Sequence, residues 1–210
     1  MTDTLQELMK RTSGYVYRDG LVEISLGLIW VFAALMHLAL VLAGNHGNRT
    51  LVIALALAMV VLITAGSLLT KRVVGALKER MTYPRTGYVE MDEKTPGAIA
   101  VVIALTMLAL ILVWYGKDIG IPALTHNSTA MSFFLAAISV FFGIRAGTRR
   151  FYLVALFTLV AGALAVIVAT DETAGTALVF GTSGATLLLT GTYALLRYLR
   201  ENPNTAEQAG

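Results

Sequence analysis

The stretch L-V-E-I-S-L-G-L-I-W-V-F-A-A-L-M-H-L-A-L-V-L-A, residues 21–43, decides the fold of this chain. Its only acid is Glu23 and its only histidine is His37, and every other residue is uncharged. A helix of about 20 apolar residues crosses the roughly 30 Å hydrocarbon core of a lipid bilayer. We therefore expect residues 21–43 to form a membrane-spanning helix.

Five more apolar stretches follow, at 51–70, 97–115, 129–144, 151–170 and 174–196. Charged residues make up only 14% of the chain, against roughly 25% in soluble domains. The pattern predicts an all-α integral membrane protein with six transmembrane helices in three antiparallel hairpins. The helices form one domain, 21–200, with a loop at 71–96.

The positive charges orient the spans. If the N-terminus lies in the cytoplasm, all of the 16 Lys and Arg residues except Arg49 and Lys117 fall on the cytoplasmic side. Loops rich in Lys and Arg stay in the cytoplasm. No cleavable signal precedes the first span, so we expect a multi-pass protein of the inner membrane with both termini inside.

The net charge of +3 comes from loops that face an anionic leaflet, so the expected partners are lipid headgroups and not nucleic acid. The chain has no cysteine, which excludes disulfides and thiolate metal sites. Its histidines show no metal-ligand spacing, and no cofactor is predicted. Catalytic signatures such as G-x-S-x-G and H-E-x-x-H are missing.

The sequence also predicts the structure of the segments outside the spans. Within 1–20, residues 2–13 predict an amphipathic helix on the cytoplasmic headgroups. Residues 71–81 should extend the second helix out of the membrane until Pro84 ends it. The tail, 201–210, has nothing to bury and should be disordered.

Two cytoplasmic segments carry a resemblance. Y-R-D-G-L-V-E-I-S-L-G-L, residues 17–28, and Y-P-R-T-G-Y-V, residues 83–89, resemble the Y-x-D-G-L-x-E and Y-P-R-x-G-Y-V signatures of an uncharacterised prokaryotic family of multi-span membrane proteins. The resemblance implies that the two segments lie together in space. It attaches to no known activity.

These segments also contain opposite charges at the membrane boundary. We expect Arg85 to pair with Asp19 or Glu23, forming a binding site or a structural clasp. Glu23 lies in the first helical turn, where capping or a pair with Arg18 is an alternative. Tyr83 and Tyr88 suit the headgroup level or packing under the bundle.

Small and hydroxyl residues mark the faces on which membrane helices pack. Such stripes follow the helical period in the last three spans. They comprise Ser132, Ala136, Ser139 and Gly143; then Ala155, Thr158, Gly162, Ala165 and Ala169; then Thr176, Ser183, Thr186 and Thr190, with Gly184 and Gly191 beside them.

The first span presents one polar face, made of Glu23, Gly27, Trp30, Ala34 and His37. An ionisable residue inside a span is a functional candidate by default. The face, with Ser183, Thr186 and Thr190 of the sixth span, either packs against other helices or lines a polar pathway.

Three functions are compatible with these patterns. The one favoured is a structural or interaction protein, either a homo-oligomer or an accessory subunit of a membrane assembly. The alternative is a small-solute or ion transporter or channel that uses the face from Glu23 to His37. The third is an interfacial enzyme or lipid-binding protein built on Asp19, Glu23 and Arg85.

Overall fold

The computed structural model describes residues 17–81 and 126–203, and α-helix is the only regular structure within these ranges. Five helices occupy them: α2 (Leu21–Asn45), α3 (Arg49–Met81), α6 (Asn127–Ala146), α7 (Arg150–Val168) and α8 (Glu172–Glu201). The predictions for residues 1–16, for the third span at 97–115 and for the tail from 204 lie outside the described residues.

Four of the helices, α2, α6, α7 and α8, are long and apolar enough to cross a membrane. The helix α3 begins with an apolar segment that includes Arg49–Met59 and continues to Met81. A helix of 33 residues is about 50 Å long at 1.5 Å per residue, which exceeds the roughly 30 Å hydrocarbon core. The predicted extension of the second helix through 71–81 is confirmed.

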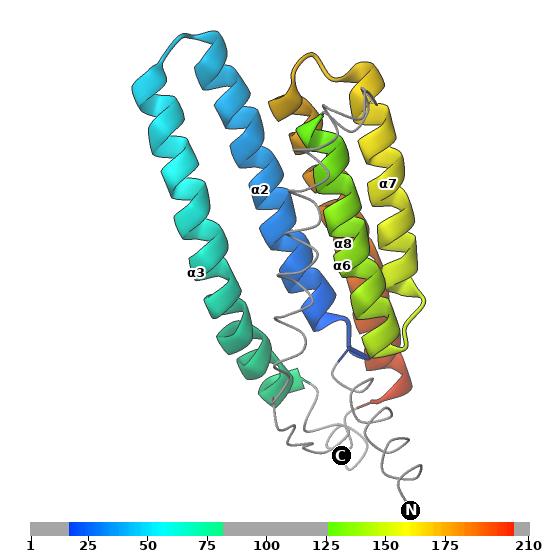
Figure 1. Ribbon diagram of the computed structural model, residues 1–210. Helices are drawn as coiled ribbons and strands as arrows, with labels where there is room; N and C mark the ends of the chain where they lie inside the picture. The colour runs from blue at the N-terminus through cyan, green and yellow to red at the C-terminus, as the bar shows by residue number, and fades with distance from the viewer. Residues whose placement is uncertain (1–16, 82–125, 204–210) are drawn as a thin grey trace, which may run out of the picture.

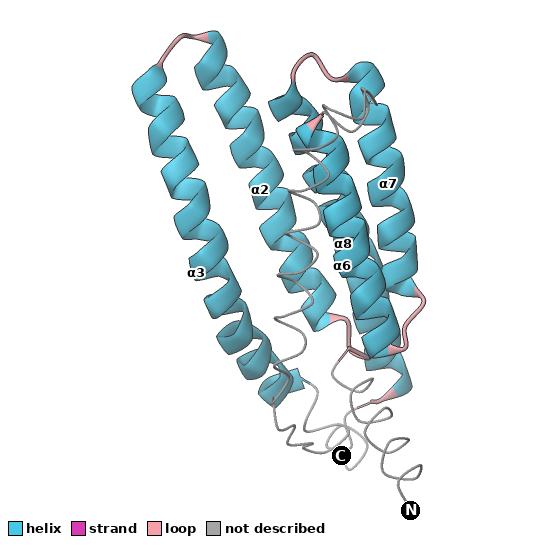
Figure 2. Cartoon of the chain, viewed as in Figure 1, coloured by secondary structure: helices cyan, strands magenta, loops and turns pink. Residues whose placement is uncertain are grey.

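Short turns join neighbouring helices into antiparallel hairpins (Figure 2). Gly47 between α2 and α3 and Gly147 between α6 and α7 both have positive φ, at 65° and 64°. Glycine adopts this left-handed backbone without a Cβ clash. Asp171 begins α8 by accepting a hydrogen bond from the Ala174 N–H at 2.7 Å, as an N-cap residue does.

The helices α2, α6, α7 and α8 form one packed unit, and α3 lies outside it against α2 (Figure 1). The most extensive packing joins α2 to α8, followed by α6 to α7. Two buried clusters fill the unit. One contains Ala33, Ala34, Leu135, Ala161, Ala165, Val179 and Phe180, and the other Ala146, Phe151, Val154 and Leu187.

Small residues face inward and large apolar residues face outward. The predicted stripe of α6 is buried throughout, as are Ala155, Thr158, Gly162 and Ala165 of α7 and Thr176, Ser183, Gly184 and Gly191 of α8. Ala169, Thr186 and Thr190, which the sequence also placed on these stripes, are only partly buried. Large side chains such as Ile167, 78% exposed, point away from the bundle. This distribution is that of helices whose outer surface meets lipid.

The contact between α2 and α8 depends on glycine. A Cβ on Gly184 would lie 2.7 Å from the backbone nitrogen of Val31 and 2.9 Å from the carbonyl oxygen of Gly27. A Cβ on Gly27 would lie 2.9 Å from the Gly184 carbonyl oxygen. The two backbones therefore touch directly, with no side chain between them.

We predict that Gly184→Ala lowers the melting temperature of the purified protein in detergent. Overpacking a tight contact costs about 1–3 kcal/mol. Gly44→Ala is the matched control, since a Cβ at that position would have no neighbouring atom of the described chain within 4 Å and alanine favours helix by up to about 1 kcal/mol. Equal effects of the two substitutions would contradict the close α2–α8 contact.

Candidate functional site

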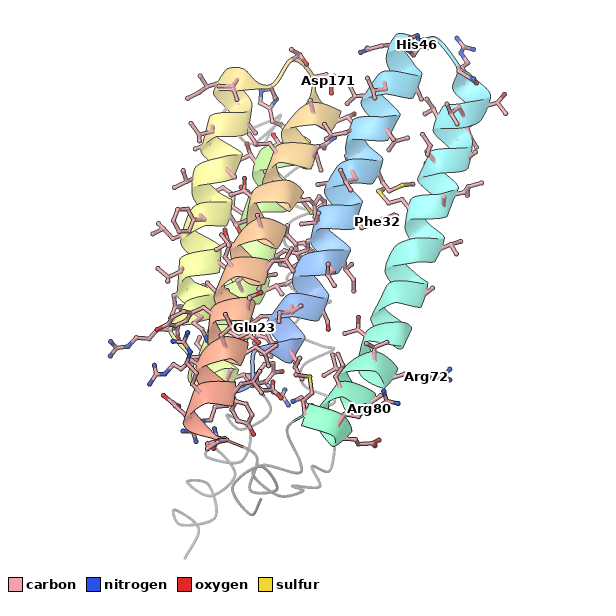
Figure 3. The ribbon with its side chains drawn as sticks, turned by 180° about the vertical axis from the view of Figure 1, so that it is seen from behind. Glu23, Phe32, His46, Arg72, Arg80 and Asp171 are labelled. Carbon is pink, nitrogen blue, oxygen red and sulfur yellow. The ribbon has the colours of Figure 1, made fainter. Side chains whose placement is uncertain are left out.

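Five helix ends meet at one end of the bundle. Glu23 lies there near the start of α2, and Arg72 and Arg80 of α3 lie toward the same end, while His46 and Asp171 are at the opposite end (Figure 3). The end of α6, the start of α7 and the last turns of α8 complete this end. Because it gathers most of the described charged side chains, we call it the charged end.

The chain enters α2 through a tight turn. Gly20 has φ 73°, and a Cβ there would overlap the Gly191 carbonyl oxygen and lie 2.9 Å from the Ala194 Cβ. Just before it, the Asp19 Oδ1 accepts a hydrogen bond from the Leu21 N–H at 3.2 Å. Asp19 thus satisfies one of the free N–H groups of the first turn, and α8 covers the turn.

Glu23 forms an ion pair with Arg150 of α7. The Arg150 Nη2 is 3.1 Å from the Glu23 Oε1, and the same nitrogen donates a 2.7 Å hydrogen bond to the Tyr17 carbonyl oxygen. The Glu23 side chain is 0% exposed and that of Arg150 is 21% exposed. Arg150 therefore ties α7 both to α2 and to the segment that precedes it.

A second ion pair ties α3 to the same turn. The Lys78 Nζ lies 3.4 Å from the Asp19 Oδ2, and both side chains are buried. Lys78 lies one helical turn after Val74, which is also buried. The C-terminal part of α3 thus lies beside the start of α2 and supplies a cation there.

The ion pair of Glu23 is incomplete in hydrogen bonds. Among the described residues, neither Glu23 oxygen has a hydrogen-bond partner, and the Arg150 Nη1 has none either. A buried charge whose partner does not also satisfy its lone pairs is held at high cost. Burial of the Glu23 carboxylate therefore costs free energy that its single ion pair offsets only in part.

Asp19 and Glu23 each lie beside a cation that the sequence analysis did not name. The partners that the structure places beside them are Lys78 and Arg150. Arg18, the alternative partner of Glu23, is instead exposed.

Arg85, Tyr83 and Tyr88 lie outside the described residues, so their part in a clasp stays a prediction. A signal for Arg150 was nevertheless present in the sequence. It precedes Val154 and Thr158 at intervals of four, which places it on the buried stripe of α7.

The rest of the α2 polar face packs within the bundle. Trp30 packs against both buried clusters, and Ala34 belongs to one of them. The His37 Nδ1 donates to the Ala33 carbonyl oxygen at 2.8 Å, and its ring stacks on Phe180 of α8 at a centroid distance of 5.4 Å.

The hydroxyl groups of α8 are engaged by helix backbones. Ser183 and Thr158 of α7 lie 2.7 Å apart, so one hydroxyl donates to the other, and each also lies 2.7 Å from a carbonyl oxygen of its own helix. Thr186 donates to the Thr182 carbonyl oxygen and Thr190 to that of Thr186, both at 2.8 Å. Bonding of this kind is common for Ser and Thr in membrane helices.

The described chain is thus of the class of helical membrane proteins, with helices packed through small residues and a buried pair of charges at one end. Comparisons with protein-family models, with curated proteins and with solved structures gave no match.

We predict that Arg150→Ala strongly destabilises the protein in detergent. Removing one partner of a buried pair costs about 3–5 kcal/mol, because the remaining charge is uncompensated. Arg149→Ala, at the adjacent exposed position, is the control and should change the melting temperature little. Adding Glu23→Gln to Arg150→Ala should restore part of the loss, and its failure to do so would sink the pairing.

Proposed function

We propose that the chain is a six-span protein of the inner membrane, with both termini in the cytoplasm, and that its role is structural. It would hold together a membrane assembly, as a homo-oligomer or as an accessory subunit. The resemblance of residues 17–28 to an uncharacterised prokaryotic family agrees with this proposal and adds no activity.

The observation that supports the structural role is that residues of the predicted polar face pack against other helices. Gly27 contacts Gly184 through backbone, His37 stacks on Phe180, and Ser183 bonds to Thr158. Side chains that would line a pathway are thus engaged in helix packing. Packing and interhelical hydrogen bonds are what hold membrane helices together.

A partner subunit would meet a surface of large apolar residues. The small-residue faces are used inside the chain, between α2 and α8 and between α6 and α7. Exposed apolar residues of α7 include Leu153, Leu156, Phe157, Val160 and Leu164. Lipid and a second subunit are both compatible with such a surface.

The six-span orientation is tested by cysteine labelling, for which the natural chain offers a background without cysteine. Cysteines at Asn48 and Glu172 should react with an impermeant reagent added outside cells. Those at Gly147 and Asn204 should react only after the membrane is opened, because the positive-inside rule places these positions in the cytoplasm. External labelling at Gly147 would refute the orientation.

Transport is the second candidate, and one observation favours it. Glu23 is fully buried, yet neither of its oxygens is hydrogen-bonded by a described residue. Ionisable residues with this burial in membrane proteins commonly carry protons or ions.

Glu23→Gln and His37→Asn separate the two candidates. Both substitutions approximately keep shape and hydrogen-bonding capacity while removing charge or titration. For a structural protein, we expect both variants to fold and to keep any cellular phenotype, with a lower melting temperature for Glu23→Gln only. A folded Glu23→Gln variant that abolishes an ion or solute flux measured in proteoliposomes would overturn the structural role.

A further inference from the structure

A pocket of about 250 Å³ opens at the charged end, between the segment before α2, the first turn of α7 and the last turns of α8. Its lining consists of Arg18, Arg150, Tyr193, Ala194, Arg197, Tyr198 and Glu201. Three guanidinium groups from three separate segments therefore line one small space, in which Glu201 is the lining carboxylate, and Arg150 also pairs with the buried Glu23.

Two of the three arginines have N–H donors that no described residue engages. Arg18 is exposed and makes no ion pair with any residue in the described ranges. The Arg150 Nη1 is buried without a hydrogen-bond partner in those ranges, although its Nη2 is engaged. Guanidinium groups bind phosphate and carboxylate through paired N–H donors.

The third arginine already holds an anionic group. The Arg197 Nε donates to the Glu201 Oε1 at 2.7 Å, one turn further along α8. Both side chains are largely exposed, at 64% and 47%. An exposed pair of this kind is worth little in water, so an incoming anion of higher charge can displace the carboxylate from Arg197.

The position of the pocket narrows the class of ligand. It lies where the apolar spans end, and Tyr193 on its rim is 65% exposed. Tyrosine is enriched at the level of lipid headgroups. The volume is below the roughly 300–1,000 Å³ of pockets for drug-sized ligands, which suits a small anionic group rather than a whole metabolite.

We propose that this pocket binds a phosphate group, as a monoester or diester, through Arg18, Arg150 and Arg197. The phosphate can belong to a lipid headgroup or to a soluble compound, since the chemistry of recognition is the same. This site goes beyond the structural role proposed above and does not depend on it.

The test uses the full chain purified in a zwitterionic detergent. One arm titrates short-chain phosphatidylglycerol, and a second arm titrates glycerol phosphate and inorganic phosphate, with the dissociation constant and the melting temperature as readouts. Diacylglycerol of the same chain length, which carries no phosphate, controls for the acyl chains. We expect phosphatidylglycerol to bind and to raise the melting temperature.

The variants compare two equal changes of charge. Arg18→Gln with Arg197→Gln removes two lining cations, and Arg149→Gln with Arg200→Gln removes two exposed cations of α7 and α8 that do not line the pocket. The first double variant should weaken phosphate binding by about tenfold or more, because charge-assisted hydrogen bonds are lost. The second should bind like the natural protein.

Glu201→Gln provides a test of opposite sign. It removes the carboxylate that occupies Arg197, so phosphate binding should become several-fold tighter while net positive charge rises by one. We expect no such increase in phosphate affinity for Arg149→Gln or Arg200→Gln. Unchanged or weaker binding by Glu201→Gln would contradict the proposed geometry.

The two arms identify the source of the phosphate. Binding of phosphatidylglycerol alone supports the site and assigns it to a lipid, whereas binding of glycerol phosphate as well supports it with a soluble ligand. Binding in neither arm overturns the proposal. Equal weakening by the two double variants also overturns it, because that result describes diffuse surface charge.

Discussion

The direct contact of two helix backbones, α2 and α8, is the constraint on which the rest of the bundle depends. Gly20, Gly27, Gly184 and Gly191 lie along it, and each has backbone or Cβ atoms of the other helix where a side chain would begin. Lipid gives no hydrophobic drive to bring helices together, so close packing has to supply the attraction. With α2 held this close, Glu23 is placed beside Gly191 and its side chain is fully buried.

That placement explains the two ion pairs. Once Asp19 and Glu23 are buried by α8, each needs a cation from another helix, and Lys78 and Arg150 supply them. Replacing a buried pair by apolar residues is often neutral or stabilising, so net stability is a weak reason for having one. We interpret the two ion pairs as contacts that fix the positions of α3 and α7 along the axis of α2.

Much of this arrangement could be predicted from the sequence, because hydropathy and helical period are properties of short stretches of chain. The helices expected at 21–43, 151–170 and 174–196 correspond to α2, α7 and α8, and most of the inward positions of small residues were predicted from the helical period alone. The extension of α3 past residue 70 followed from the continued helical pattern.

The ion-pair partners were not predicted, since choosing Arg150 over its neighbours requires knowing which helices are adjacent. The pocket at the charged end was not predicted for the same reason. Its arginines come from three segments that only the folded chain brings together.

The reach of Arg150 along the chain has a consequence for biogenesis. Glu23 belongs to the first predicted span, and its cation stands at the start of α7, 133 positions beyond the Tyr17 carbonyl oxygen that the same guanidinium binds. The glycines that cover α2 arrive later still, with α8. During synthesis the first helix therefore enters the bilayer with an unpaired carboxylate at its boundary. Its contacts with Arg150 and with the glycines of α8 can form only after α7 and α8 have been made, whereas its contact with α3 can form earlier.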